Sequence, residues 1–178
     1  MPRSVMEHSF SEVPRVRIPR SQFNRSFGHK TTFDSDFIIP LAIDDIVPGD
    51  TFNTDIHFYI RLASPTLYAM MDNMYFETFA FFVPYRLLWD NWEKMHGAQD
   101  NPADSIDFTI PAVSSNTTQD LTVASGFNFL CDYLGLPHKA SVDLSEISAL
   151  PFRAYNLIFN EWFRDQNLQD SLTVNTDN

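Results

Sequence analysis

Residues 31–97 contain three apolar segments whose spacing restricts the fold more than any other feature of the chain. In Phe33–Ile43 and in Phe52–Leu62, large apolar side chains recur at alternate positions, with Asp, Asn, His or Arg at many positions between them. A period of two places one set of side chains against a core and the other toward water or a neighbouring chain. Met74–Pro84 is apolar on both faces, which predicts a strand covered on both sides. The Pro-Gly pair within Ile46–Asp50 predicts a turn between the first two strands.

The composition favours a protein with large buried or interfacial aromatic surfaces. The 178 residues include 17 Phe and 5 Gly, and 44% of the residues are hydrophobic, which excludes a disordered chain. Phe-rich strands suit thick two-sheet cores or subunit interfaces, because their flat rings bury a large area. The sequence has no GxGxxG, P-loop, GxSxG or HExxH motif, so no motif in it predicts an enzyme or a resident cofactor.

After the third strand, the spacing of apolar residues changes to that of helices. The final helix carries Ala154, Leu157 and Ile158 on one stripe. The polar loop that precedes the helices is longer than an ordinary connection, which indicates an insertion or a functional loop. The predicted segments in chain order are a helix over Tyr85–His96 ended by Gly97, a surface loop over 98–125, a short helix over Gly126–Leu134 capped by Ser125, a helical turn over Asp143–Ser148, and a helix beginning at Pro151.

The charge of the chain is distributed unevenly. Its formal net charge is −11, but residues 1–30 contain six Lys and Arg and two Glu, a charge of +4, which leaves −15 for residues 31–178. An acidic body repels nucleic acid at long range, whereas a basic arm can still contact phosphates or the acidic surfaces of neighbouring subunits. Both interpretations stay open from the sequence. The cations predicted to make these contacts are Arg15, Arg17, Arg20, Arg25 and Lys30.

Six aromatic side chains in the two clearest helical segments are candidates for a subunit interface. Four of them crowd one helix, which suggests contact with more than one partner surface. Two other interpretations stay open, namely a core in which helices pack on a sheet and a platform on which sugars or bases stack. The six candidates are Trp89, Trp92, Tyr155, Phe159, Trp162 and Phe163.

Side chains that could perform metal or redox chemistry are few. His57 lies on the polar face of the second predicted strand beside Asp55, whereas a metal site of the cupin type requires several clustered His residues. Asp34 and Asp36 share a strand face and could hold a hard cation between subunits. The single Cys131 cannot form an internal disulfide. No apolar run reaches the roughly 18 residues that a membrane-spanning helix needs.

Several long stretches of the sequence resemble one viral family. Phe33–Pro40 (FDSDFIIP), Val47–Asp55 (VPGDTFNTD) and Met74–Gly97 (MYFETFAFFVPYRLLWDNWEKMHG) resemble the N-terminal part of the major capsid protein of the microviruses, which are small single-stranded DNA bacteriophages. They are most similar to the gokushovirus branch. Arg20–Lys30 (RSQFNRSFGHK) is similar to the basic leader of that family, and Pro151–Asn167 (PFRAYNLIFNEWFRDQN) resembles the helix after its first insertion. The resemblance extends over residues 15–167.

The resemblance implies a mainly β fold, the viral jelly roll, which is a double-sheet β-sandwich with helical insertions. Residues 1–30 would be the basic N-terminal arm, residues 31–97 the first jelly-roll strands with the following helix, and residues 98–178 an incomplete insertion domain with a loop and helices. The implied function is that of a non-enzymatic capsid protein without cofactors. It would self-assemble in the host bacterial cytoplasm into the T=1 icosahedral shell of a virion.

The resemblance also implies partners. These would be identical capsid subunits, single-stranded DNA, a small basic DNA-packaging protein and a host receptor contacted by the insertion loops, with no membrane involved. The residues alone leave two further functions open. One is a jelly-roll module that binds a glycan or a receptor, and the other is a cupin-type metalloenzyme.

The number of predicted strands is too small for a whole jelly roll. A double-sheet jelly roll has about eight strands, whereas this chain supplies only a few. We therefore expect that the chain is the N-terminal portion of the fold. Unpaired strand edges attract one another, so we also expect the isolated chain to aggregate or to fold poorly.

Overall fold

The computed structural model describes residues 19–63, 65–113, 118–120, 126–137 and 141–177. The chain divides into two compact units, residues 1–31 and residues 32–178. The described part of the first unit is extended and exposed. Within it, the amide and the hydroxyl of Ser26 both donate to Oδ1 of Asn24, at 3.0 and 2.6 Å.

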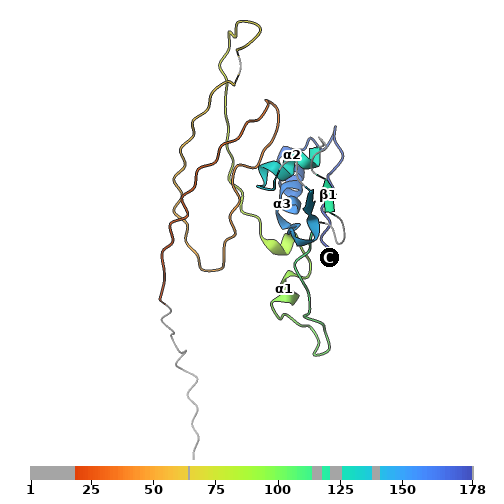
Figure 1. Ribbon diagram of the computed structural model, residues 1–178. Coiled ribbons are helices and arrows are strands. Elements are labelled where there is room, and N and C mark those ends of the chain that lie inside the picture. Colours follow the sequence, from red (N-terminus) through yellow and green to blue (C-terminus); the bar gives the residue numbers. More distant parts are fainter. Residues whose placement is uncertain (1–18, 64, 114–117, 121–125, 138–140, 178) are drawn as a thin grey trace, which may run out of the picture. The chain divides into compact units, whose positions relative to one another are not determined.

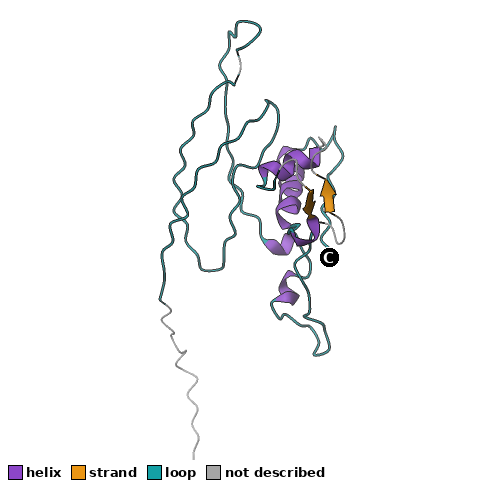
Figure 2. Cartoon of the chain, in the orientation of Figure 1, coloured by secondary structure: helices purple, strands orange, loops and turns teal. Residues whose placement is uncertain are grey.

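In the second unit, the three Phe-rich segments are extended but not paired through their backbones. Figure 2 draws the described residues from 32 to 84 as loop, without a hydrogen-bonded strand. A strand needs a neighbour to pair its N–H and C=O groups, and the jelly roll therefore stays a prediction. The predicted turn is confirmed: the amide of Asp50 donates to the carbonyl of Val47 at 3.0 Å, and Gly49 has a φ of 91°.

The helical segment after Pro84 is divided into two short helices. A 3₁₀ helix, η1, spans Tyr85–Leu87, and a single turn of α-helix, α1, spans Trp92–Met95. The sequence predicted one continuous helix here, and the difference has a packing reason. The break after η1 allows two consecutive residues, Leu88 and Trp89, to be buried together, which one stripe of a continuous helix would not do.

The C-terminal half contains the longer helices and one small sheet (Figure 1). The predictions of a helix near 126–134 and of a helix at Pro151 are confirmed, whereas the predicted cap Ser125 lies outside the described residues. The short turn predicted at 143–148 is a 3₁₀ helix in which Oδ1 of Asp143 accepts from the amide of Ser145 at 2.9 Å. In chain order the elements are β1 (Thr118–Asp120), α2 (Gly126–Tyr133), β2 (Ser141–Asp143), η2 (Leu144–Glu146), α3 (Leu150–Ile158) and the π-helical turn η3 (Phe159–Phe163).

Local contacts explain where these elements begin and end. The two strands β1 and β2 pair antiparallel, with Thr118 opposite Asp143. Helix α3 begins with a proline in its first turn, where the missing N–H would have had no helical partner. The amide of Ala149, just before α3, donates instead to the carbonyl of Pro111 at 2.8 Å. This bond ties the start of α3 to the polar loop.

The main core lies between the segment after Pro84 and helix α3. Its fully buried members are Leu88, Trp89 and Leu150, which belong to segments more than 60 residues apart in the chain. The partly buried side chains that pack against them are Val83, Tyr85, Trp92, Met95, Phe108, Ala154 and Leu157. This core fastens the end of the third Phe-rich segment to α3.

Candidate assembly surface

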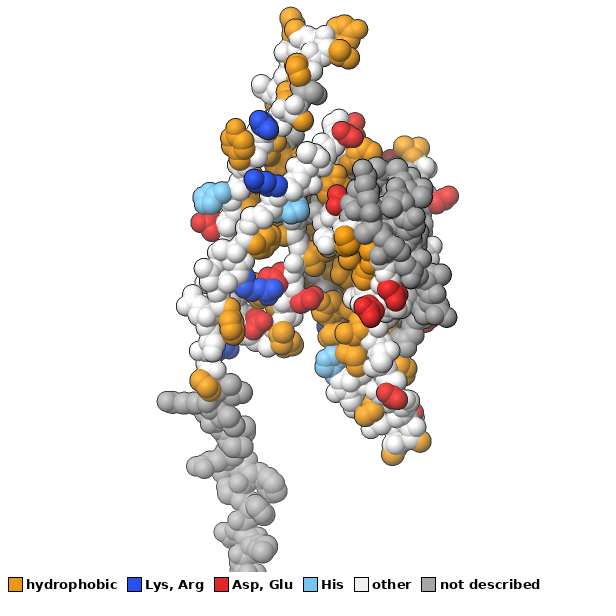
Figure 3. Space-filling model, viewed as in Figure 1, with side chains coloured by type: hydrophobic (Ala, Val, Ile, Leu, Met, Phe, Trp, Pro, Cys, Tyr) orange, Lys and Arg blue, Asp and Glu red, His pale blue; other side chains and the backbone are white. Residues whose placement is uncertain are grey.

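The extended segments between Phe33 and Phe82 carry most of the exposed large apolar side chains of the described residues. Phe37, Ile56 and Phe82 are 70%, 62% and 75% exposed. In Figure 3, hydrophobic side chains (orange) alternate with polar and charged ones on the visible face of the extended segments. A single exposed Leu or Phe is ordinary, but a long succession of them is typical of a surface that makes further contacts.

Aromatic rings bring the three extended segments together. The ring of Phe76, in the third segment, lies 6.0 Å from that of Phe33 and 5.4 Å from that of Phe58. Phe33 and Phe58 belong to the first and second segments, so each segment contributes one ring. Tilted and edge-on ring pairs at these distances contribute a favourable interaction energy in addition to that of the apolar area that they bury. Side-chain packing therefore aligns the three segments without backbone pairing.

A second aromatic group joins the third segment to the end of α3. Phe163 lies 5.6 Å from Phe79 and 6.0 Å from Phe81, both in edge-on contact. Trp162 lies 5.6 Å from Phe81, yet its side chain is 73% exposed. The group therefore has an inner part, around Phe163, and an outer part, which Trp162 presents to solvent.

The structure separates the six aromatic candidates into different roles. Trp89 is 0% exposed and belongs to the core of this chain, not to its surface. Trp92 is half-buried between the rings of Tyr85, at 4.7 Å, and His96, at 4.5 Å. Tyr155, Phe159 and Phe163 are also half-buried, and Trp162 is the most exposed of the six. Their participation in a subunit interface stays a prediction.

Three tyrosine hydroxyls connect the helices to the first extended segments, a role that the apolar pattern did not predict. The hydroxyl of Tyr155 donates to the carbonyl of Ile38 at 2.8 Å. That of Tyr133 donates to the carbonyl of Thr32 at 2.9 Å. Tyr85 donates to the carboxylate of Asp45. A phenol supplies both an apolar ring for a helix face and a polar tip for a distant backbone.

The contact between Tyr85 and Asp45 predicts a loss of stability at high pH. Burial, and then the adjacent Asp45 carboxylate, raise the pKa of Tyr85 from 10.0 to about 12. A phenol with a raised pKa stabilises the fold fully below its unfolded pKa, and this contribution is lost as the pH rises through the folded value. We expect urea titrations to show a free energy of unfolding that falls between about pH 10 and pH 12.

The matched variant for this prediction is Tyr85→Phe, which keeps the ring and removes the ionisable group. Burial also raises the pKa values of Tyr133 and Tyr155. The free energy of unfolding of the variant should therefore fall less steeply between about pH 10 and pH 12 than that of the wild type, but it should still depend on pH. An unchanged slope would contradict the assignment to Tyr85.

The predicted cations of the basic arm lie in or next to the first unit. Arg15 and Arg17 are outside the described residues, whereas Arg20, Arg25 and Lys30 are exposed on extended backbone. Extended backbone lets these side chains reach a phosphate backbone or an acidic protein surface without unfolding a compact element. The structure therefore leaves both interpretations of the arm open.

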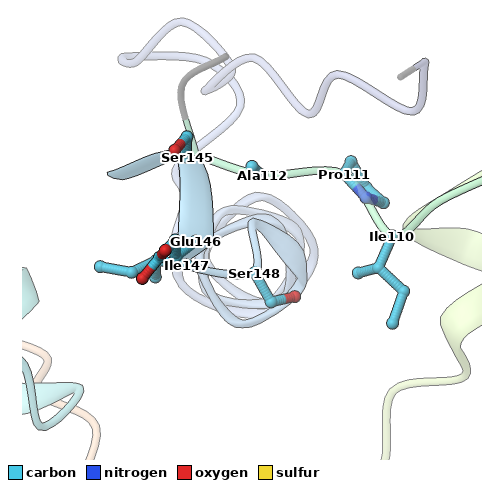
Figure 4. A pocket seen from close by; sticks show the side chains of 7 residues that line it. All are labelled: Ile110, Pro111, Ala112, Ser145, Glu146, Ile147 and Ser148. Carbon is cyan, nitrogen blue, oxygen red and sulfur yellow. The ribbon is translucent and has the colours of Figure 1, made fainter. Parts of the chain in front are cut away.

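A shallow pocket of about 190 Å³ lies beside the start of α3. Figure 4 shows that Ile110, Pro111 and Ala112 line one side of it and Ser145–Ser148 the other. The lining offers two hydroxyls and the carboxylate of Glu146, but no His, Cys or Lys.

The metal-site interpretation gains no support from the described part of the chain. His57 is strongly exposed, and its Nε2 lies 3.7 Å from the carboxylate of Asp55, which is exposed as well. In the same part of the chain, no three His, Cys, Asp or Glu side chains are grouped so that they could hold a metal ion. Among the helices described, none has the length and apolar character needed to cross a membrane.

Comparison with known proteins gives one consistent result. Residues 11–178 match the Phage_F family, described as capsid protein (F protein). The chain is 49% identical over 170 residues to capsid protein VP1 of Bdellovibrio phage phiMH2K, which covers 94% of this chain and 30% of that protein. It is 46% identical over 173 residues to capsid protein VP1 of Chlamydia phage 1, and this alignment covers 96% of this chain and 28% of that protein. The identity to capsid protein VP1 of Spiroplasma virus 4 is 33% over 175 residues, and this alignment covers 96% of this chain and 30% of that protein.

These alignments also define how much of a related protein the chain represents. The chain spans about three tenths of the length of the curated relatives that it matches. In contrast, nearly the whole of this chain is aligned in each comparison. The alignments therefore extend over both the extended segments and the helices.

Proposed function

Because the chain belongs to the Phage_F family of capsid proteins, we propose that it forms part of a major capsid subunit of a small icosahedral single-stranded DNA bacteriophage. The family resemblance predicted from residues 15–167 is confirmed by the match over residues 11–178. Since the relatives are much longer, the proposal concerns a subunit that includes further residues. Its function is structural, and no step of it requires a catalytic residue or a cofactor.

The main structural support for the proposal comes from the exposed apolar side chains between Phe33 and Phe82. A subunit that joins a shell buries side chains of this kind against its neighbours, and the apolar area removed from water drives association. In a closed shell, each contact is repeated by symmetry, so a modest area buried at one interface becomes a large buried area over the whole shell.

We also propose that the three extended segments are the first strands of a jelly roll. The ring contacts of Phe76 with Phe33 and Phe58 support this part of the proposal, because they align one residue from each segment. The missing backbone partners would be strands supplied by the rest of the subunit. Residues 98–178 would then be the beginning of an insertion that packs on this sheet through the core around Trp89.

The proposed partners follow from the charge distribution and from the family. Identical subunits would contact the aromatic surface, and single-stranded DNA or a small basic packaging protein would lie on the inner side. A receptor would contact the insertion loops. The protein would be located in the virion after assembly in the bacterial cytoplasm.

Electron microscopy of the full-length subunit tests the proposal directly. We expect closed particles of uniform diameter from the wild-type subunit. Substituting Phe82→Asp should reduce their yield strongly, whereas Asn53→Asp, which adds the same charge at an exposed polar position, should leave the particles intact. Uniform monomers from the wild-type subunit under all assembly conditions would refute the proposal.

The basic arm gives a separate prediction for DNA binding. Each cation that meets a phosphate of single-stranded DNA contributes about −0.7 to the slope of log K against log salt. Replacing Arg15, Arg17, Arg20, Arg25 and Lys30 by Gln should therefore make the slope shallower by roughly 3.5. Filter binding of an oligonucleotide at several salt concentrations measures this slope. An unchanged slope would favour the other interpretation, in which the arm binds acidic protein surfaces.

A further inference from the structure

Residues 65–75, here named the methionine loop, join the second extended segment to the third and are exposed throughout. The backbone bends at 67–68 and at 72 and forms neither helix nor strand in this loop. Its one charged side chain is Asp72, whose Oδ1 accepts from the amide of Asn73 at 2.8 Å. The large apolar side chains that the loop exposes are Leu67, Tyr68, Met70, Met71, Met74 and Tyr75.

Half of the methionines of the chain are gathered in this loop. Met70, Met71 and Met74 are three of the six methionines in the sequence, and their side chains are 47%, 97% and 60% exposed. Met95, in contrast, is half-buried and packs against the main core. The two remaining methionines, Met1 and Met6, lie outside the described residues. The described methionines therefore divide into an exposed group and one shielded side chain.

Exposure of a methionine sulfur has a chemical consequence, because hydroperoxides oxidise thioethers that they can touch. The sulfur gives two electrons to the peroxide: the O–O bond breaks, an S=O bond forms, and the hydroperoxide leaves as an alcohol, or as water when the oxidant is hydrogen peroxide. The product is a polar sulfoxide. In the reverse reaction, which methionine sulfoxide reductases catalyse, two thiols become a disulfide and the sulfoxide oxygen leaves as water.

We propose that the methionine loop is a site of reversible oxidation, in which Met71 reacts first, Met74 next and Met70 last. The oxidant is a hydroperoxide, and the reductant is a thiol-dependent methionine sulfoxide reductase. The order of reaction follows the exposed fractions of the three side chains, since the peroxide reaches the sulfur through water. The exposed backbone without helix or strand on both sides of Met71 lets the reductase take up the segment without unfolding a compact element.

Oxidation changes the surface that the loop presents to other molecules. The loop lies within the stretch from Phe33 to Phe82, whose exposed apolar side chains are proposed to be buried between subunits. A sulfoxide oxygen that loses water without gaining a hydrogen-bond donor opposes this burial. Oxidised chains should therefore associate more weakly than reduced chains. This consequence rests on the proposed function, whereas the order of oxidation depends only on the exposure of the sulfur atoms.

Peptide mapping by mass spectrometry tests the oxidation site. The 178-residue chain is treated with hydrogen peroxide at submicromolar protein concentration, and the sulfoxide at each methionine is followed with time. We expect Met71 to be oxidised at least roughly tenfold faster than Met95, with Met74 and Met70 between them. In concentrated urea, where all the methionines are exposed, the rates should agree within roughly twofold. A methionine sulfoxide reductase supplied with thiol should then restore Met71.

Two results of the mapping would overturn the proposal. One is an equal rate of oxidation at Met71 and Met95 in the chain without urea. The other is a sulfoxide at Met71 that the reductase leaves in place while it reduces free methionine sulfoxide in the same tube.

Sedimentation velocity before and after peroxide treatment tests the consequence for association. The matched variant is Met71→Leu/Met74→Leu, which keeps apolar side chains of similar size and removes the two most reactive sulfur atoms of the loop. Peroxide should weaken the association of the wild-type chain by roughly tenfold or more and that of the variant by less than about threefold. Equal responses of the two chains would overturn the link between oxidation and association. A wild-type chain that is monomeric before oxidation would overturn this link together with the proposed function, and the mapping would still decide the oxidation site.

Discussion

Replacing Phe37, Ile56 and Phe82 together by Asp is expected to weaken the self-association of the chain by roughly 1000-fold or more. All three side chains are largely exposed on the extended segments. Burying one side chain of this size contributes about 1.5–3 kcal/mol, and a carboxylate at the same place opposes burial. The wild-type chain should sediment as a mixture of oligomers, and the triple variant should shift toward the monomer.

The control for this experiment adds the same charge without removing apolar area. Asn53, Thr54 and Asn73 are exposed on the same stretch of the chain, and their substitution by Asp also changes the net charge by three. Sedimentation velocity on both triple variants separates apolar burial from charge repulsion. If the polar control dissociated as completely as the apolar variant, burial of the aromatic side chains would not be the cause.

Replacing Trp89 by Ala is expected to destabilise the C-terminal half by about 3–5 kcal/mol. Trp89 is fully buried between Leu88 and Leu150, and removal of the indole leaves a cavity at the junction of two distant segments. Resistance to limited proteolysis at submicromolar concentration measures the effect under conditions in which association is slow. Cleavage within residues 85–163 should become much faster.

Trp162→Ala supplies the comparison within the same chain. Its side chain is 73% exposed, so the loss of stability should stay below about 1 kcal/mol. At the same time, this variant removes the outer part of the aromatic group around Phe81 and Phe163. Equal effects of the two substitutions on proteolysis would contradict the division into a core Trp and a surface Trp.

The comparison of Trp89 with Trp162 shows how much the spacing of apolar residues can predict about the burial of a side chain. Both residues are tryptophans in segments with helical spacing. The spacing indicates that a side chain belongs to an apolar face, but whether that face meets the same chain or another chain depends on distant residues. Leu150 comes close to Trp89 only because α3 folds back onto the turn after η1.

The same reasoning applies to the polar contacts. The tyrosine hydroxyls that join the helices to Thr32, Ile38 and Asp45 cross up to 117 residues of sequence, and no local signal indicates their partners. Asn156 and Asn160 likewise looked like ordinary polar positions of an amphipathic helix. Their hydrogen bonds to the backbone of Leu172 and Thr173 are visible only in the folded chain.

Several properties of this protein follow from the order of its residues alone. The Pro-Gly turn at 47–50, the helices near 126–134 and at Pro151, and the membership of a capsid family depend on short-range backbone preferences and on long stretches of shared sequence. The division of the helix after Pro84 and the burial of Trp89 depend on contacts between segments far apart in the chain. Such contacts are set by the competition of many apolar and polar groups for the same neighbours, and that competition is resolved only when the whole chain is folded.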